Sequence, residues 1–261
     1  MGNYSSISVI VPVFNEEKTV GGVLTSLLSF GSVAEIICVN DGSTDKSGEI
    51  VQTFKDRIKI INLTQNRGKG FALVAGLREA GGEVVVFLDS DLFDLTEGHL
   101  QQLVSPLLEK RAEATLGAIH NPRLRSFLLP FVGQRAYWRK DLLSHLNNMA
   151  KTRYGVEVYL NEAFKKKRVE VVWLKGLGHV IKHKKRGFSE TSKEYFIEWL
   201  EVSRTLLWNN EKKLGKKMPI LNHPRIKTTK DLIRALARVS DKEVLEALKK
   251  YFSSLSQHFK G

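Results

Sequence analysis

Residues 7–17 read ISVIVPVFNEE, a run that passes abruptly from apolar to polar side chains. The first seven, Ile7–Val13, are short, β-branched and almost continuously apolar, which is typical of a strand buried on both faces of a parallel sheet. Asn15, Glu16 and Glu17 then open a helical pattern, so the turn presents backbone N–H groups and polar side chains. Open α/β sheets bind their ligands at such carboxyl ends of strands.

The alternation of strand and helix patterns continues to about residue 118. Four further apolar, β-branched runs predict strands at Glu35–Asn40, Ile58–Leu63, Glu83–Leu88 and Ala112–Ala118. Between them, apolar residues at helical spacing predict helices near 20–28, 50–54 and 71–80. Strands that alternate with helices predict an α/β fold, with a Rossmann-like, mostly parallel central sheet flanked by helices.

Beyond residue 118 the pattern is less regular. We expect a loop over a site at 121–132, helices at 136–150, 154–163 and 190–208, and a strand at 168–174. Two amphipathic helices, 230–238 and 242–259, carry apolar stripes that favour a core or a homodimer interface over a membrane anchor. The expected organisation is one domain in two halves, 1–118 and 119–215, followed by a helical C-terminal extension at 216–261.

Composition excludes several classes of protein. With 42% hydrophobic and 26% charged residues over 261 positions, the chain is globular rather than disordered. A single cysteine, Cys38, excludes an internal disulfide framework and a cysteine-rich zinc site. The N-terminus lacks a signal-peptide pattern, and no apolar run approaches the ~20 residues of a membrane span. We therefore expect a cytoplasmic protein, either soluble or peripheral at the inner membrane face.

The net charge of +13 is unevenly distributed. Residues 1–118 hold 10 Lys and Arg against 15 Asp and Glu, whereas residues 119–261 hold 31 against 13. A basic half favours an anionic partner, which is a phosphorylated acceptor, an anionic membrane surface or nucleic acid. A solubilising, lysine-rich surface explains the same charge equally well.

Polar segments follow the predicted strands in order. In the turn Asn40–Asp45, Asp41 is placed to accept a hydrogen bond from a nucleobase imide. In Asn66–Gly70 a lysine lies between two glycines at a helix start, where N–H groups, the positive helix end and an ammonium suit a diphosphate. Asp89-Ser90-Asp91 offers paired carboxylates for a divalent cation, which offsets charge on a departing diphosphate. Each segment alone is a common turn, but their succession indicates one nucleotide-binding edge.

These segments, SVIVPVFNEEKTV, ICVNDGSTDKS, NRGKGFALVAGL and VVFLDSDL, resemble the signatures of glycosyltransferase family 2, nucleotide-sugar enzymes of the GT-A fold. The resemblance covers about residues 6–118 and implies a metal-dependent transferase that uses a UDP- or GDP-sugar and Mg²⁺ or Mn²⁺. It implies that the donor nucleotide is bound by Pro12, Val13, Phe14, Glu16, Asp41, Lys69, Asp89 and Ser90. Asp89 and Asp91 form the Asp-x-Asp metal motif, with Asp91 favoured as the direct ligand and as a catalytic residue.

The second half carries a further resemblance. Gly133-Gln134-Arg135-Ala136, followed by RYGVEV at 153–158, is similar to the acceptor-side segment of glucosyl-3-phosphoglycerate synthases. This implies that Gln134 and Arg135 lie beside the acceptor and that Glu157 is catalytic. Glu157 is then the base of an inverting reaction, or it binds donor sugar hydroxyls in a retaining one. A carboxylate ion-paired within a helix is the structural alternative.

A histidine and a basic segment complete the candidate site. GT-A relatives often place a histidine after this strand as a further metal ligand, which implies His179, with His183 as the competing position. Lys182 and Lys185 follow, and they either hold a phosphate of the donor or acceptor or belong to a solvated basic loop.

The expected reaction moves a sugar from a nucleoside diphosphate to a polyprenyl phosphate or to a small phosphorylated acid such as phosphoglycerate. Inversion is favoured on the family resemblance. A nucleotidyltransferase on a GT-A-like fold is the first alternative, but it would carry a glycine-rich basic loop where this chain has Pro12–Glu17. A basic, non-enzymatic nucleic-acid-binding protein is the second, and it leaves the Asp-x-Asp motif unexplained, so nucleic acid is a disfavoured partner.

Overall fold

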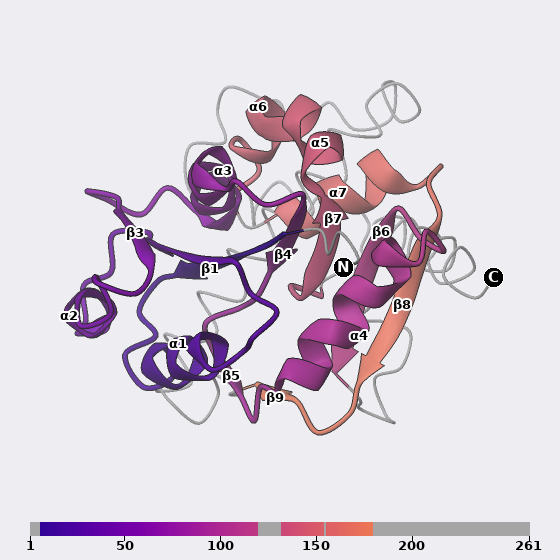
Figure 1. Cartoon of the computed structure of the whole chain (residues 1–261). Helices are drawn as coiled ribbons and strands as arrows, with labels where there is room; N and C mark the ends of the chain where they lie inside the picture. The colour runs from indigo at the N-terminus through magenta and orange to yellow at the C-terminus, as the bar shows by residue number, and fades with distance from the viewer. Residues whose placement is uncertain (1–5, 120–131, 154, 180–261) are drawn as a thin grey trace, which may run out of the picture.

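The computed structural model describes residues 6–119, 132–153 and 155–179. These residues form one seven-stranded sheet with helices packed on both faces, and a separate two-stranded sheet at one edge (Figure 1). The predicted α/β class is confirmed. The predicted loop at 121–132 falls almost entirely outside the described residues, as do the helix at 190–208 and the C-terminal extension at 216–261.

The first half of the sheet follows the predicted strands closely. Its members are β1 (Ile7–Val13), β2 (Glu35–Asn40), β3 (Lys59–Asn62) and β4 (Val84–Phe87). All four are parallel, in the order β3-β2-β1-β4, and β1, β2 and β4 are buried almost throughout. The chain therefore reverses its direction of winding between β1 and β4, which is the point where open sheets of this kind bind ligands.

The second half of the sheet contains β6 (Ala114–Ile119), β7 (Arg135–Trp138) and β8 (Val169–Leu174), in the order β4-β7-β6-β8. Strand β7 runs antiparallel to both of its neighbours, with Arg135 opposite Phe87 of β4. Because β7 is antiparallel, its amino end lies at the same edge as the carboxyl ends of β1 and β4. The segment before β7 is thereby brought to the ligand-binding edge.

The predicted helix at 136–150 is wrong in its first part. Residues 135–138 are a strand because they alternate, with Tyr137 in one core cluster and Ala136 in the other. Helical structure begins only afterwards, in short pieces: α5 (Arg139–Leu142), a 3₁₀ turn (Leu143–His145) and α6 (Leu146–Met149). The predicted helix at 154–163 corresponds to α7 (Val156–Phe164), so that prediction is confirmed.

Helix α4 (Glu97–Leu108) was not predicted from the sequence, which carries Gly98 and Pro106 inside it. A capping box starts it: the Thr96 hydroxyl accepts from the His99 N–H, and the His99 ring accepts from the Thr96 N–H at 3.2 Å. Its buried apolar face then packs on the sheet, so tertiary packing outweighs the low helix propensity of glycine and proline.

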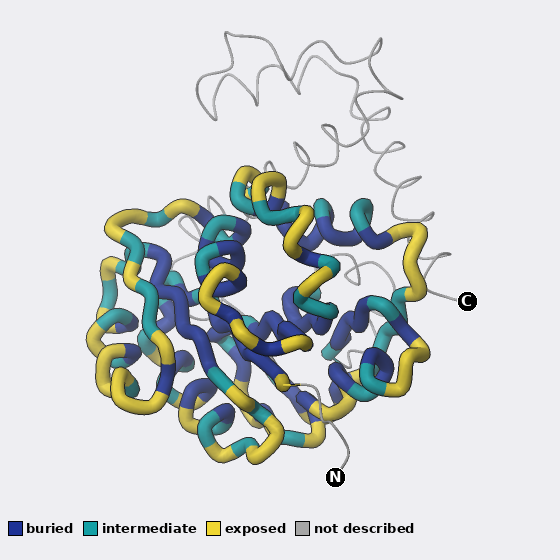
Figure 2. Tube along the Cα trace, turned by 45° about the horizontal axis from the view of Figure 1, so that its top comes forward, coloured by how far each residue is buried: buried dark blue, intermediate teal, exposed yellow. Residues whose placement is uncertain are grey.

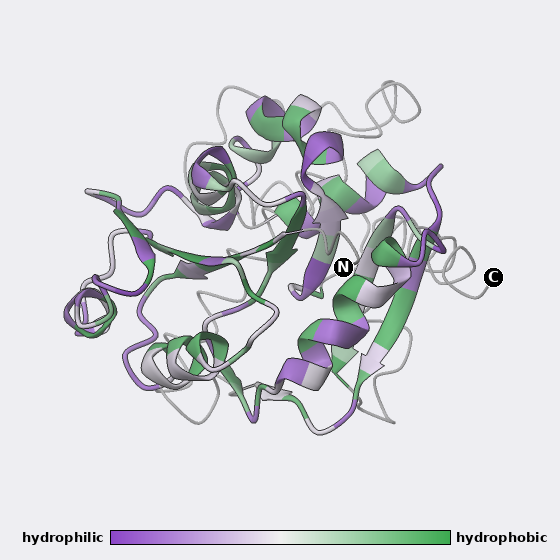
Figure 3. Ribbon diagram, in the orientation of Figure 1, coloured by the Kyte–Doolittle hydropathy of each residue, from purple (hydrophilic) through white to green (hydrophobic). Residues whose placement is uncertain are grey.

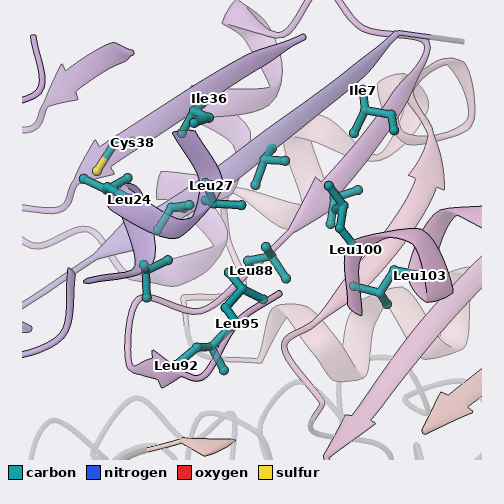
Figure 4. Close-up of a cluster of buried hydrophobic side chains, with 14 of the residues drawn as sticks. Ile7, Leu24, Leu27, Ile36, Cys38, Leu88, Leu92, Leu95, Leu100 and Leu103 are labelled. Atoms are coloured by element: carbon teal, nitrogen blue, oxygen red, sulfur yellow. The ribbon is translucent and has the colours of Figure 1, made fainter. Parts of the chain in front are cut away.

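Two apolar clusters lie on the two faces of the sheet. One is covered by α1 (Val20–Leu28), α2 (Ser47–Gln52) and α4, and the close-up in Figure 4 shows residues of that cluster, among them Leu24 and Leu27 of α1 and Leu100 and Leu103 of α4. The other is covered by α3 (Lys69–Glu79), α6 and α7. Strands β1, β2 and β4 are buried, whereas β3 and most of β8 are partly exposed, and further exposed residues lie on the surrounding turns and outer helix faces (Figure 2). Helix α4 has an apolar and a polar side (Figure 3). None of the helices in the described residues is both long and apolar enough to cross a membrane.

Candidate active site

Side chains tie the turns after β1 and β2 into one edge. Asn15 has a left-handed backbone, with a φ of 56°, and its side-chain oxygen accepts from the backbone N–H of Thr44 at 2.8 Å. In return, the N–H groups of Asn15 and Glu16 donate to the hydroxyls of Ser43 at 3.1 Å and Ser47 at 2.7 Å. These reciprocal bonds fix the first turn against the second, so both present one preformed surface.

Asp41 connects the second turn to the third. Its buried carboxylate accepts from the backbone N–H of Arg67 at 2.7 Å and of Gly68 at 2.8 Å. Burial raises the pKa of the Asp41 carboxyl, although these two donors and the charges of Arg67 and Arg153 oppose the rise. Gly68 has a φ of 91°, which a residue with a side chain rarely adopts, and it leads directly into α3.

Lys69, the first residue of α3, joins the two halves of the domain. Its ammonium lies 2.5 Å from Oδ1 of Asp89, after β4, and 2.6 Å from Oε1 of Glu157, on α7. Burial alone would lower the pKa of Lys69, but the carboxylates of Asp89 and Glu157 outweigh it and hold that pKa above its ordinary value. The lysine is therefore a fixed cation between the carboxylate of Asp89, after β4, and that of Glu157, on α7.

The turn before β7 encloses Asp89 from the other side. The side-chain amide of Gln134 donates to Oδ2 of Asp89 at 2.9 Å, so both oxygens of this carboxylate accept hydrogen bonds. Gly133 packs directly against the same group, since a Cβ added there would lie 2.1 Å from Oδ2. The position of Asp89 is thus set by Lys69, Gln134 and the bare backbone of Gly133.

Replacing Gly133 by alanine is expected to displace Asp89 and to weaken nucleotide binding about tenfold, because a Cβ cannot occupy space that the carboxylate fills. Overpacking of this kind also costs about 1–3 kcal/mol of folding stability. The measurement is UDP affinity by calorimetry in the presence of Mn²⁺. Gly22→Ala is the matched control, because a Cβ there meets nothing within 4 Å; equal UDP affinities in the two variants would contradict the packing argument.

The backbone segments that carry the candidate metal ligands Asp91 and His179 lie next to each other at the two-stranded sheet. Strand β5 (Leu92–Phe93) pairs antiparallel with β9 (Gly178–His179), and Leu92 lies opposite His179. The backbone of His179 therefore lies beside the residue that follows Asp91. The side chain of His179 and the whole of His183 lie outside the described residues, and among the side chains that are described no three His, Cys, Asp or Glu residues converge on one point.

The chemistry of these residues fits a divalent cation. Carboxylate oxygens are the ligands that Mg²⁺ and Mn²⁺ prefer, and an imidazole is an acceptable addition. Both oxygens of Asp89 accept hydrogen bonds, from Lys69 and Gln134. The choice of Asp91 as the direct ligand stays a prediction from the Asp-x-Asp motif.

The remaining predicted residues divide into three groups. Pro12 and Phe14 are half-buried at the end of β1, and Ser90 is buried between the two aspartates. The side chain of Val13 belongs to the apolar core, so only its backbone, which accepts from the Asp41 N–H at 2.8 Å, contributes to the edge. Lys182 and Lys185 lie outside the described residues.

Arg135 is buried in the structure. The sequence places it beside the acceptor, and in the structure it is 1% exposed and points into the sheet face covered by α3 and α7. It donates to the carbonyl of Val132 at 2.5 Å, to Oδ1 of Asn161 at 2.8 Å and to the Tyr137 hydroxyl at 3.3 Å. The guanidinium is thus directed at groups of β7 and α7, and its expected contact with the acceptor stays a prediction. The odd-numbered register of β7 sends it inward, and that register was not visible while 136–150 was expected to be a helix.

Sequence reasoning also missed several residues of the site. Asn15, Ser43 and Ser47 lie inside the quoted motifs, but their role in joining two turns depends on a contact between segments 28–31 residues apart. Gly133 was quoted only as part of a motif, and its contact with Asp89 joins the segments at the ends of two neighbouring strands, β4 and β7. The signal that could have pointed to these residues is the position of each segment beside the end of a strand.

Comparison with known proteins agrees with this geometry. The family description "Glycosyl transferase family 2" matches residues 8–173. The chain is 36% identical over 124 residues to the poly-beta-1,6-N-acetyl-D-glucosamine synthase of Staphylococcus epidermidis, covering 46% of this chain and 29% of that protein. It is 35% identical over 94 residues to the undecaprenyl-phosphate 4-deoxy-4-formamido-L-arabinose transferase of Pseudomonas aeruginosa, covering 33% and 28%. The match thus spans about a third of the length of these relatives.

Solved structures extend the likeness beyond residue 118. Glucosyl-3-phosphoglycerate synthase from Mycobacterium tuberculosis, in complex with Mn²⁺, UDP-glucose and phosphoglyceric acid, has a TM-score of 0.61 and 26% identity, covering 78% of this chain and 79% of that one. The same enzyme with Mg²⁺ and UDP has a TM-score of 0.62. The α/β fold is therefore GT-A-like, and the chain belongs to glycosyltransferase family 2.

Proposed function

We propose that this chain is a metal-dependent glycosyltransferase that moves a sugar from a UDP-sugar to an acceptor carrying a phosphate group. The observation that carries the proposal is the contact of Lys69 with both Asp89 and Glu157. It joins the donor-side and acceptor-side segments at one point of the ligand-binding edge. Family membership supports the reaction class, and the UDP complexes of the neighbouring structures favour UDP over GDP.

In this proposal the donor lies across the preformed edge. Pro12, Phe14 and Glu16 flank the nucleoside, and Asp41 receives the imide of the base. The diphosphate lies at the start of α3, where the positive helix end and the ammonium of Lys69 offset its charge. Asp91, with Asp89 and His179, would hold a divalent cation, which would supply Lewis-acid stabilisation of the departing UDP.

The acceptor approaches from the side of Gln134 and Glu157. The described residues after 131 carry 10 Lys and Arg against 4 Asp and Glu, which favours an anionic acceptor. The neighbouring synthase structures contain phosphoglyceric acid or glycerol 3-phosphate, and one relative is named for undecaprenyl phosphate. A phosphate monoester is the chemistry that these molecules share. Lys182 and Lys185 remain predicted contacts for it.

We further propose inversion, with Glu157 as the base that takes the acceptor proton. Glu157 is 7% exposed and lies at the first turn of α7, where its carboxylate contacts Lys69. The anomeric coupling constant of the product, measured by NMR, decides the point. A product of unchanged configuration would assign Glu157 to binding donor sugar hydroxyls instead.

Acceptor-dependent release of UDP tests the proposed function. The full chain is incubated with UDP-glucose or UDP-N-acetylglucosamine and Mn²⁺, in separate arms with 3-phosphoglycerate, glycerol 3-phosphate and undecaprenyl phosphate in detergent micelles. We expect one arm to release UDP at least about tenfold faster than the acceptor-free reaction, and EDTA to abolish the difference. If no acceptor raises the rate of UDP release and EDTA leaves that rate unchanged, the proposal is contradicted. Activity confined to the undecaprenyl phosphate arm would support peripheral attachment at the cytoplasmic membrane face.

The homodimer predicted through the C-terminal helices is a separate prediction, which a sedimentation experiment tests.

A further inference from the structure

The buried Arg135 closes a ring of contacts around the candidate site. On one side, Lys69 touches Asp89 and Glu157 directly. On the other, Gln134 contacts Asp89, the neighbouring Arg135 contacts Asn161, and Asn161 lies one helical turn after Glu157 on α7. Residues four apart share a helix face, so Asn161 and Glu157 are presented together toward the sheet.

Arg135 holds the segment that encloses Asp89. Its Nε donates to the carbonyl of Val132 at 2.5 Å, and the two residues between them, Gly133 and Gln134, are those that pack against Asp89 and hydrogen-bond to it. The planar guanidinium thus bonds the start of this turn and, through Nη1, the side chain of Asn161. A lysine has no second fixed donor with which to bond both.

Electrostatic effects on Tyr137 place Glu157 near the same cluster. Burial raises the pKa of the Tyr137 phenol, the charge and hydrogen bond of Arg135 oppose the rise, and the charge of Glu157 adds to it. The two charged groups therefore act on one hydroxyl from α7 and from β7. Asn161 and Tyr137 are both buried, so the cluster has little freedom to rearrange.

We propose that Arg135 is a positioning residue: it holds the Val132–Gln134 turn and helix α7 in one arrangement, so that Asp89 and Glu157 both reach Lys69. This inference rests on the proposed function. In this inference Arg135 need not touch the substrate. It acts through its bonds to Val132 and Asn161, which keep the residues at the ligand-binding edge in position.

The test compares Arg135→Met, Asn161→Leu and Asn161→Asp in the UDP-release assay at a temperature where each variant is folded. We expect kcat to fall at least about tenfold in Arg135→Met and Asn161→Leu, while UDP affinity in Mn²⁺ falls less than the about tenfold expected of Gly133→Ala, because the turns at Glu16 and Asp41 are untouched and Asp89 keeps its contact with Lys69. Asn161→Asp keeps an acceptor for the guanidinium and should retain kcat within about threefold. The double variant should lose no more than the worse single one.

Hydrogen exchange separates this inference from the proposed function, because it needs no substrate. Peptides covering 132–138 and 155–164 should exchange at least about tenfold faster in Arg135→Met than in wild type. Ser8→Ala is the control, since Ser8 is also buried but bonds Glu35 at the opposite edge of the sheet. Unchanged exchange in these two peptides, or unchanged kcat in a folded Arg135→Met, would overturn the inference. If Arg135→Met does not fold, equal behaviour of Asn161→Leu and Asn161→Asp would overturn it too.

Discussion

Replacing Asp91 by asparagine is expected to lower kcat about 10³-fold, because stabilisation of the departing diphosphate by a bound cation is worth several kcal/mol and each 1.36 kcal/mol is a factor of ten. An amide keeps the size of the side chain but removes the charge that binds the metal. Mn²⁺ affinity in the presence of UDP should fall in the same variant by at least about tenfold. Steady-state kinetics and calorimetry measure the two effects.

Asp94→Asn is the matched control for this experiment. Asp94 is exposed and lies three residues further along, in a left-handed backbone conformation that asparagine also tolerates. It should keep the activity of the wild type. An Asp91→Asn variant with more than about one tenth of wild-type kcat would show that Asp91 is not the metal ligand on which the reaction depends.

Replacing Lys69 by methionine is expected to lower kcat/KM about 10²-fold and to move the acidic limb of the pH–rate profile to higher pH. Without the ammonium, Asp89 and Glu157 are left as two carboxylates with no cation between them. The two negative charges then repel each other, so the charged pair that the reaction requires is less stable at low pH. Removing one member of a partly buried ion pair also costs about 2 kcal/mol of stability, below the range for fully buried pairs.

Two variants, Lys69→Arg and Lys59→Met, serve as controls for Lys69→Met. An arginine at 69 keeps the charge but not the single-point geometry, so it should restore the acidic limb while kcat stays low. Lys59 pairs with Glu35 at 2.7 Å, at the opposite edge of the sheet, and its loss should leave the pH–rate profile unchanged. A Lys69→Met profile that superimposes on that of wild type would mean that Lys69 does not control these carboxylates during the reaction.

The local pattern of apolar residues in the sequence predicted the first half of the sheet. Strands β1, β2 and β4 are apolar runs whose burial on both faces leaves a strong signal, and β1 and β2 match their predicted bounds. The same reasoning failed where packing overrides propensity. Helix α4 forms despite Gly98 and Pro106, because its apolar face is covered by the sheet. Strand β7 is four residues long and depends on two neighbouring strands for its hydrogen bonds.

The candidate site likewise contains residues that the local sequence pattern predicts and contacts that it does not. Asp41 and Asp89 could be named from the sequence, because each follows a strong strand pattern, and Lys69 because it lies between two glycines at a helix start. The contact of Lys69 with Glu157 could not, since it joins positions 88 residues apart and depends on where α7 packs. The inward direction of Arg135 depends on the register of β7 against β4, which no local pattern specifies. Sequence therefore names the residues of a motif better than the contacts between motifs.

Calorimetric titration of UDP into the full chain, with Mn²⁺ and then with EDTA, tests the central claim most directly. Metal-dependent binding that Asp91→Asn abolishes and Asp94→Asn preserves is the predicted result, because Asp91 would hold the cation that offsets the charge of the diphosphate. UDP binding of equal strength with and without metal would contradict the account of this edge, and so would an absence of UDP binding under both conditions.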